Sequence, residues 1–248
     1  MLLRTERLVK SFGALSAVNG VDLGVEAGAL HSIIGPNGAG KTTLFNLLTG
    51  QLAPTSGRIL LEDRDITGTP PQRIAHLGMA RSFQRTNVFP ALTVLDNVWV
   101  AAFARGSWRG LAWRPTARYG DVREQALRAL AEVGLADKGA QRAGEISHGE
   151  QRQLELAIAL AANPRVLLLD EPAAGLSPEE TRRMIALIRG LKVRYTIVLI
   201  EHKMDVIMSI SDRVSVMYFG ALIAEGTPAE IQRNPEVRRA YLGGMATV

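Results

Sequence analysis

The stretch GPNGAGKTT, Gly35 to Thr43, lies between an apolar run, LHSII, and a segment of helical character, TTLFNLLTG. It satisfies the pattern G-x-x-x-x-G-K-[ST] with Gly35, Gly40, Lys41 and Thr42. Glycines let the backbone turn so that successive N–H groups face an anion, and the following helix adds its positive N-terminal end. Lys41 is placed to reach the terminal phosphates, and Thr42 to offer a hydroxyl to Mg²⁺. Because a strand pattern precedes the loop and a helix pattern follows it, a chance Gly-rich turn is disfavoured, and we predict a site for a nucleoside triphosphate with Mg²⁺.

Short apolar runs alternate with helical patterns on both sides of this loop. VLLLDEP and TIVLIEH are too short to cross a membrane, which takes about 20 apolar residues, and they are typical of buried strands. Strand–helix alternation of this kind predicts an α/β fold with a buried parallel sheet. The segment from about residue 85 to 150 has helical periodicity instead, so we expect a helical lobe inserted into the core. The resulting division is a core of 1–84 and 151–226, a helical lobe of 85–150 and a helical tail of 227–248.

Composition limits the partners and the setting. The chain has 248 residues, a net charge of +5 and no cysteine, so it has no disulfide or thiolate metal site. No long Lys/Arg block is present, which favours a solvated basic surface over a nucleic-acid partner. The first residues, MLLRTERLVKSF, lack the uninterrupted apolar stretch of a signal peptide.

A second element suited to phosphate chemistry follows the apolar run RVLLLDEP. Asp170 ends that predicted strand, where a carboxylate can hold Mg²⁺ through water. Glu171 comes next, and adjacent residues at a strand end point in different directions. One carboxylate can therefore serve the metal while the other acts as general base for an attacking water. A solvated acidic strand end is the alternative, and the phosphate loop in the same chain argues against it.

Two other classes of phosphate-loop protein fit poorly. The guanine-reading motif N/T-K-x-D has its nearest match in HKMD, where His202 replaces Asn or Thr. DITG, Asp65 to Gly68, imitates a GTPase switch, but no apolar strand leads into it. A small-molecule kinase has no need of Glu171 beside Asp170, because its acceptor is not water.

The stretch EISHGEQRQLELAIALAANP, Glu145 to Pro164, predicts a capped helix, with Ser147 as N-cap and Glu150 as its capping-box partner. It also resembles the signature motif of ATP-binding cassette (ABC) ATPases, usually written L-S-G-G-Q. The corresponding positions here are Ile146, Ser147, His148, Gly149 and Glu150, with Gln151 opening the helix. The two interpretations agree, since free N–H groups at a helix start point at an anion.

The resemblance extends over the whole chain in the order of the family's motifs. It implies a phosphate-loop core with an antiparallel β subdomain at the N-terminus, and ATP and Mg²⁺ as cofactors. Phe12 matches the aromatic residue that stacks on adenine, and Val18 would pad the same ring. Gln84 matches the loop glutamine that links the core to the helical lobe and reaches the metal, together with Thr42 and Asp170. His202 matches the switch histidine at the γ-phosphate, which makes Glu171, His202 and Gln84 the implied catalytic set. The implied ATP contacts in the phosphate loop are Gly35, Pro36, Asn37, Gly38, Ala39, Gly40, Lys41, Thr42 and Thr43.

Three positions depart from the family's pattern. His148 stands where the signature usually has Gly, and Glu150 stands for its final Gln. Ser177 stands where the loop after Glu171 usually ends in Asp, which puts the usual cross-dimer role of that Asp in doubt. We expect the signature to function despite the first two changes.

Several stretches are similar to the ATPase subunits of branched-chain amino acid importers. They are RSFQRTNVFPALTVLDNVWVA, ISHGEQRQLELA, DEPAAGLSPEE and the tail GTPAEIQRNPEVRRAYLG. The insertion RGSWRGLAWRPTARYG fits the longer of the two ATPase subunits that such systems usually carry. Its Trp and Arg residues suggest a loop near the membrane face beside the permease, with packing on the helical lobe as the alternative. Urea or amide importers and lipopolysaccharide exporters share the pattern, and a soluble ABC ATPase acting on nucleic acid is a more distant alternative.

In this family each ATP lies between one phosphate loop and the signature of a second chain. The resemblance therefore implies a homodimer, or a heterodimer with a similar ATPase subunit. It further implies transmembrane permease subunits, indirectly a substrate-binding protein, and no nucleic acid. The expected location is peripheral, on the cytoplasmic face of the cell membrane.

Overall fold

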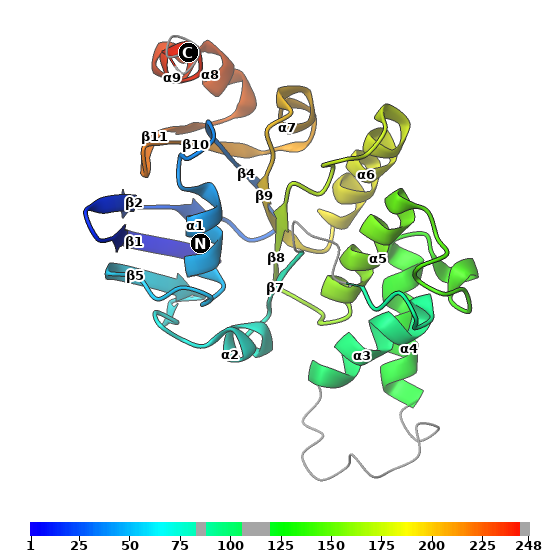
Figure 1. The fold of residues 1–248 in the computed structure, drawn as a ribbon. Coiled ribbons are helices and arrows are strands. Elements are labelled where there is room, and N and C mark those ends of the chain that lie inside the picture. The colour runs from blue at the N-terminus through cyan, green and yellow to red at the C-terminus, as the bar shows by residue number, and fades with distance from the viewer. Residues whose placement is uncertain (83–87, 106–119, 244–248) are drawn as a thin grey trace.

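The computed structural model describes residues 1–82, 88–105 and 120–243, and it contains two β-sheets with helices between and around them (Figure 1). The strands are β1 Leu3–Phe12, β2 Leu15–Val21, β3 Gly24–Val25, β4 Leu30–Ile34, β5 Ser56–Leu61, β6 Arg64–Asp65, β7 Met79–Arg81, β8 Val166–Asp170, β9 Thr196–Ile200, β10 Arg213–Tyr218 and β11 Ala221–Gly226. The helices are α1 Lys41–Leu48, α2 Pro71–His76, α3 Val94–Arg105, α4 Gly120–Glu132, the 3₁₀ helix η2 Ala136–Lys138, α5 His148–Leu160, α6 Pro178–Leu191, α7 Met204–Ile210, α8 Pro228–Arg233 and α9 Pro235–Gly243.

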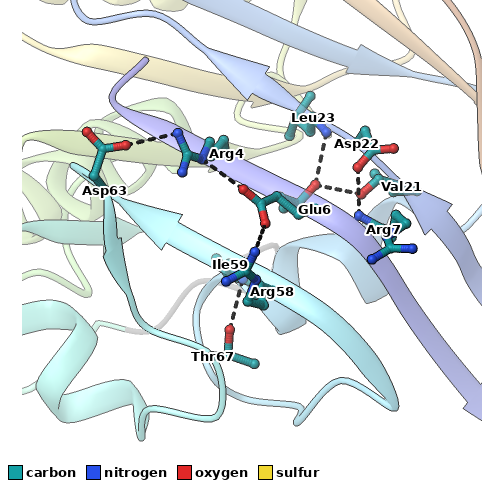
Figure 2. A network of polar contacts seen from close by, with 11 residues as sticks. Arg4, Glu6, Arg7, Val21, Asp22, Leu23, Arg58, Ile59, Asp63 and Thr67 are labelled. Carbon is teal, nitrogen blue, oxygen red and sulfur yellow. Dashed lines mark hydrogen bonds and ion pairs between the residues drawn. The ribbon is translucent and has the colours of Figure 1, made fainter.

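The first sheet is antiparallel, in the order β2-β1-β5-β6, with β3 paired to β1. A surface network of ion pairs links its strands: Arg4 contacts Glu6 and Asp63, and Glu6 also contacts Arg58 (Figure 2). Exposed pairs of this kind contribute little free energy, so the sheet is held mainly by its buried face. The expected antiparallel β subdomain at the N-terminus is confirmed.

The second sheet is the predicted parallel one. Its order is β11-β10-β4-β9-β8-β7, and every neighbouring pair is parallel except β10 with β11. Strand β4 leads into the phosphate loop, β8 into Asp170–Glu171 and β9 into His202. Since β4, β9 and β8 are adjacent and parallel, their carboxyl ends lie together, and the crevice there is the usual ligand site of such sheets.

Period-two alternation divides the buried strands between two cores. In β8, Leu167 and Leu169 face the core shared with the helical lobe, whereas Val166 and Leu168 face the core shared with α1 and the antiparallel sheet. Both faces are covered, which explains why VLLLD is apolar at every position but its last. Helix α1 therefore lies between the sheets, and the helical lobe lies beyond β8 and β9 (Figure 1).

The inserted lobe consists of α3, α4 and α5, which pack on one another. Helix α5 begins at His148 rather than at Gln151, because Ser147 is its N-cap. It runs to Leu160 as a single helix, so the boundary predicted between residues 150 and 151 falls inside it.

Candidate active site

At two positions of the phosphate loop only glycine fits, because neighbouring strands lie close to the loop backbone. Gly35 has φ 155, and a Cβ there would lie 2.2 Å from the carbonyl oxygen of Met217. Gly40 has φ 102, and its Cβ would lie 2.2 Å from the carbonyl oxygen of Ala17. No side chain fits at either place, and Gly40 also has a backbone conformation that other residues avoid. The turn is therefore tightly enclosed by β10 on one side and β2 on the other.

Lys41 is folded into the loop it follows. Its Nζ donates to the carbonyl oxygens of Gly35, at 2.7 Å, and Pro36, at 3.0 Å. Burial lowers the pKa of Lys41, and the nearby carboxylates of Glu171 and Asp170 oppose that shift. The loop thus holds a cation next to its own backbone, facing two carboxylates. Thr42, the next residue, is exposed at the start of α1, where its hydroxyl is accessible to a metal ion.

Phe12 is suited to stacking, whereas Val18 is not. Phe12 ends β1, is 48% exposed, and has Lys10 Nζ 5.1 Å from its ring centroid. An exposed aromatic residue beside a cation offers a base a stacking surface. Val18 is fully buried in the core. Its side chain therefore supports the sheet and has no open surface for the padding role that was expected of it.

Asp170 and Glu171, adjacent at the end of β8, differ in burial and in their contacts. Asp170 is buried at the end of β8 and makes an ion pair with Arg81, with 2.7 Å between Nη2 and Oδ2. Glu171 has φ 48, a left-handed conformation that costs a non-glycine residue about 1–3 kcal/mol and is concentrated at functional sites. Its N–H still donates to the carbonyl oxygen of Ile200, so the backbone turn follows directly after the last pairing with β9.

His202 meets Glu171 at this edge. Its Nδ1 lies 3.9 Å from Glu171 Oε1 and 3.6 Å from Glu201 Oε2. Glu201 is buried, and its Oε2 accepts from the backbone N–H groups of His202, at 2.9 Å, and Lys203, at 3.2 Å. Glu201 therefore shapes the turn that carries His202. The sequence analysis missed it, although a carboxylate at the end of an apolar strand, TIVLIE, is the same signal that identified Asp170.

The signature residues form a capped helix start. Ser147 and Glu150 complete a capping box, and Glu150 is also paired with Lys138. The side chain of Gln151 donates to the carbonyl oxygens of Ala143 and Ile146, so it braces the turn. The sequence prediction of a capped helix is confirmed.

The signature packs on the segment after Glu171. A Cβ on Gly149 would lie 2.6 Å from Glu180 Oε1, and a Cβ on Gly175 would lie 3.4 Å from Nε2 of His148. His148 therefore occupies space beside the loop that leads to α6, where Ser177 is the N-cap. A cavity of about 220 Å³ lies here, lined by residues of both segments including Ser147, Gly149 and Glu180.

The structure brings together the phosphate loop, Asp170–Glu171 and His202, while the signature packs against the segment that leads to α6. Gln84 and the Trp/Arg insertion lie outside the described residues, so their expected places stay predictions. Arg81 was not singled out from the sequence. Its position in the stretch MARSFQ, shortly before Gln84, is the signal that could have drawn attention to it.

This geometry is that of a nucleoside triphosphatase of the ABC class. A family model described as ABC transporter matches residues 18–174, and the chain belongs to that family. A second model, described as branched-chain amino acid ATP-binding cassette transporter, matches residues 221–247. The expectation of an ABC ATPase is confirmed, with ATP as its nucleotide.

Comparison with individual proteins indicates which branch of the ABC family this chain resembles. The chain is 43% identical to the high-affinity branched-chain amino acid transport ATP-binding protein LivG of Escherichia coli K12, over 98% of each protein. It is 44% identical to the protein BraF of Pseudomonas aeruginosa, which carries the same description, again over 98% of each. The crystal structure of the ADP conformation of an ATP-binding cassette of an ABC transporter superposes with a TM-score of 0.88, at 34% identity and 98% coverage of both chains. The chain is thus an ATP-binding subunit of the branched-chain amino acid transporter type.

Proposed function

We propose that this chain binds and hydrolyses ATP to energise uptake of branched-chain or related amino acids through a membrane permease. The observation that carries the proposal is the meeting of phosphate loop, Asp170–Glu171 and His202 at the ends of adjacent parallel strands. Similarity to LivG and BraF along nearly the whole chain supports the transport role.

The residues divide the chemistry among them. The loop N–H groups and the start of α1 bind the phosphates, and Lys41 exchanges its loop carbonyls for phosphate oxygens. Glu171 is the general base for the attacking water, and its left-handed backbone turns the carboxylate out of the strand. His202 is close enough to Glu171 that one water molecule can contact both. Phe12 holds the base by stacking.

Mg²⁺ fits the donors present at this site. Thr42 offers a hydroxyl and Asp170 a carboxylate, which are the hard oxygen ligands that Mg²⁺ prefers. In the part of the chain that the structure describes, no three His, Cys, Asp or Glu residues form a metal cluster. At nucleotide sites Mg²⁺ is usually held by one or two protein oxygens together with the substrate phosphates. Gln84 would be a further ligand. When bound, the ion offsets the charge that develops on the phosphates.

A second chain completes the site. The signature lies on the helical lobe, packed against α6, and its own residues line a cavity that includes no residue of the phosphate loop. We therefore assign Ser147, His148, Gly149, Glu150 and Gln151 to the ATP of a partner, either another copy or a similar subunit. ATP binding closes the pair and hydrolysis releases it.

The remaining partners follow from the transport role. Permease subunits, and a substrate-binding protein acting through them, complete the transporter, and the chain lies at the cytoplasmic face of the membrane. None of the described helices combines the length and hydropathy that a bilayer crossing requires. Nucleic acid is not a partner in this proposal.

Complementation tests the proposal. Expression of the chain in a strain that lacks LivG is expected to restore uptake of radiolabelled leucine, and a variant without Lys41 is not. If the expressed chain hydrolyses ATP but does not restore leucine uptake, the transported substrate is a related one, such as urea or an amide. Co-purification with nucleic acid instead of a polytopic membrane protein would contradict the transport role altogether.

A further inference from the structure

Arg81, the last residue of β7, joins the proposed metal carboxylate to the helix of the phosphate loop. Its Nη2 donates to Asp170 Oδ2 at 2.7 Å, and its Nη1 donates to Asn46 Oδ1 at 2.6 Å. Its guanidinium also lies 5.5 Å from the ring centroid of Phe45. Asn46 and Phe45 belong to α1, which begins with Lys41. One side chain therefore connects β7, β8 and α1.

Both members of the ion pair are withdrawn from water. The side chain of Arg81 is 8% exposed and that of Asp170 is 3% exposed. A buried charge needs a partner, and loss of one member leaves the other uncompensated. The planar guanidinium presents its donors in a fixed fork, so the two acceptors it binds are held at a fixed separation.

The pair engages one of the two carboxylate oxygens of Asp170. Arg81 contacts Oδ2, and Oδ1 is outside the pair. A carboxylate held through one oxygen has less freedom to rotate, which restricts the positions that its second oxygen can take. Groups that orient a metal ligand in this way commonly change metal affinity or activity by about 10–100-fold when removed.

We propose that Arg81 is a positioning residue for Mg²⁺–ATP. It holds Asp170 at a fixed distance from α1, so that Oδ1 and Thr42 are ready to receive the hydrated metal ion of the bound nucleotide. Arg81 does not touch the ion itself. This inference rests on the proposed use of Asp170 and Thr42 by Mg²⁺.

The test compares nucleotide binding with and without the metal. Dissociation constants of a fluorescent non-hydrolysable ATP analogue are measured in Mg²⁺ and in EDTA for the native chain, Arg81→Met and Arg81→Lys. Lysine keeps the charge but cannot reach two acceptors as a fork. For Arg81→Met the dissociation constant in Mg²⁺ is expected to rise about tenfold or more, with a change below about twofold in EDTA. Arg81→Lys is expected to fall between Arg81→Met and the native chain.

A matched control separates positioning from stability. Arg152 and Glu155 form a comparably buried pair at 3.0 Å on α5, with side chains 9% and 7% exposed. Arg152→Met should lower the melting temperature as Arg81→Met does, yet keep the native Mg²⁺ dependence of binding. Equal weakening in Mg²⁺ and EDTA, or native Mg²⁺ dependence in both Arg81 variants, overturns the proposal. If Arg81→Met does not fold, native Mg²⁺ dependence in Arg81→Lys alone overturns it. A native chain that binds the analogue equally well in Mg²⁺ and EDTA would contradict the proposed metal site itself, which is a different failure.

Discussion

Substitution of Glu171 by Gln tests the hydrolytic step directly. The two side chains have nearly the same shape, so packing, the backbone at φ 48 and the N–H bond to Ile200 are expected to survive. What is lost is the ability to accept a proton from water. A general base contributes about 10²–10⁴-fold, equivalent to about 2.7–5.5 kcal/mol of the activation barrier.

The structure favours the upper part of that range. The side chain of Glu171 is only 24% exposed. Solvent water therefore has limited access to the site and cannot readily take over the role of general base. His202 lies 3.9 Å from Glu171 and contacts Glu201, whose Oε2 lies 3.6 Å from His202 Nδ1. In this proposal His202 orients the water molecule, and Glu171 is the carboxylate that accepts its proton.

The assay is single-turnover phosphate release, with nucleotide affinity and dimer formation measured on the same preparation. We expect unchanged affinity, slow phosphate release and ATP retained in a closed dimer. Glu179→Gln is the control, because Glu179 is an exposed carboxylate on α6 paired with Arg183, outside the site. Phosphate release within about threefold of the native rate would exclude Glu171 as the general base.

Three further predictions concern other parts of the molecule. Phe12→Ala should weaken ATP binding by about 1–3 kcal/mol, the value of base–aromatic stacking, whereas Leu15→Ala on the same hairpin, 67% exposed, should leave it unchanged in a fluorescence titration. Glu201→Gln should reduce kcat but not nucleotide affinity, because the hydrogen bond from the backbone N–H of His202 becomes weaker while the phosphate loop is unchanged. Equal effects on kcat and on nucleotide affinity would contradict this role. Burial lowers the pKa of His31, with Glu225 opposing and Arg213 assisting, so below the usual value of about 6.5 the unfolded chain takes up a proton that the folded chain does not. The melting temperature should therefore fall as the pH is lowered through about 6.5, and His31→Gln should flatten that slope; an unchanged slope would show that other groups cause it.

Several features of this protein could be predicted from short stretches of its sequence. The phosphate loop, the apolar strands on either side of it and the capped helix at Ser147 each depend on residues close together in the sequence. Such features follow from backbone rules that operate over a few positions, such as glycine in tight turns and hydroxyl side chains at helix starts. The resemblance to the ABC family then assigned roles to residues far apart, among them Phe12 and His202.

Only the tertiary structure decided which side chains meet. Adjacency of β4, β9 and β8 brings the loop, Glu171 and His202 to one edge, and strand order is not encoded in any single strand. The pairing of Arg81 with Asp170 joins residues 89 positions apart. Because both side chains are buried, loss of either one would leave an uncompensated charge in the interior. Val18 shows the opposite case: the family resemblance implied a ligand contact, but its side chain is enclosed by the core. Burial depends on what the rest of the chain packs against a residue, and a local stretch of sequence does not contain that information.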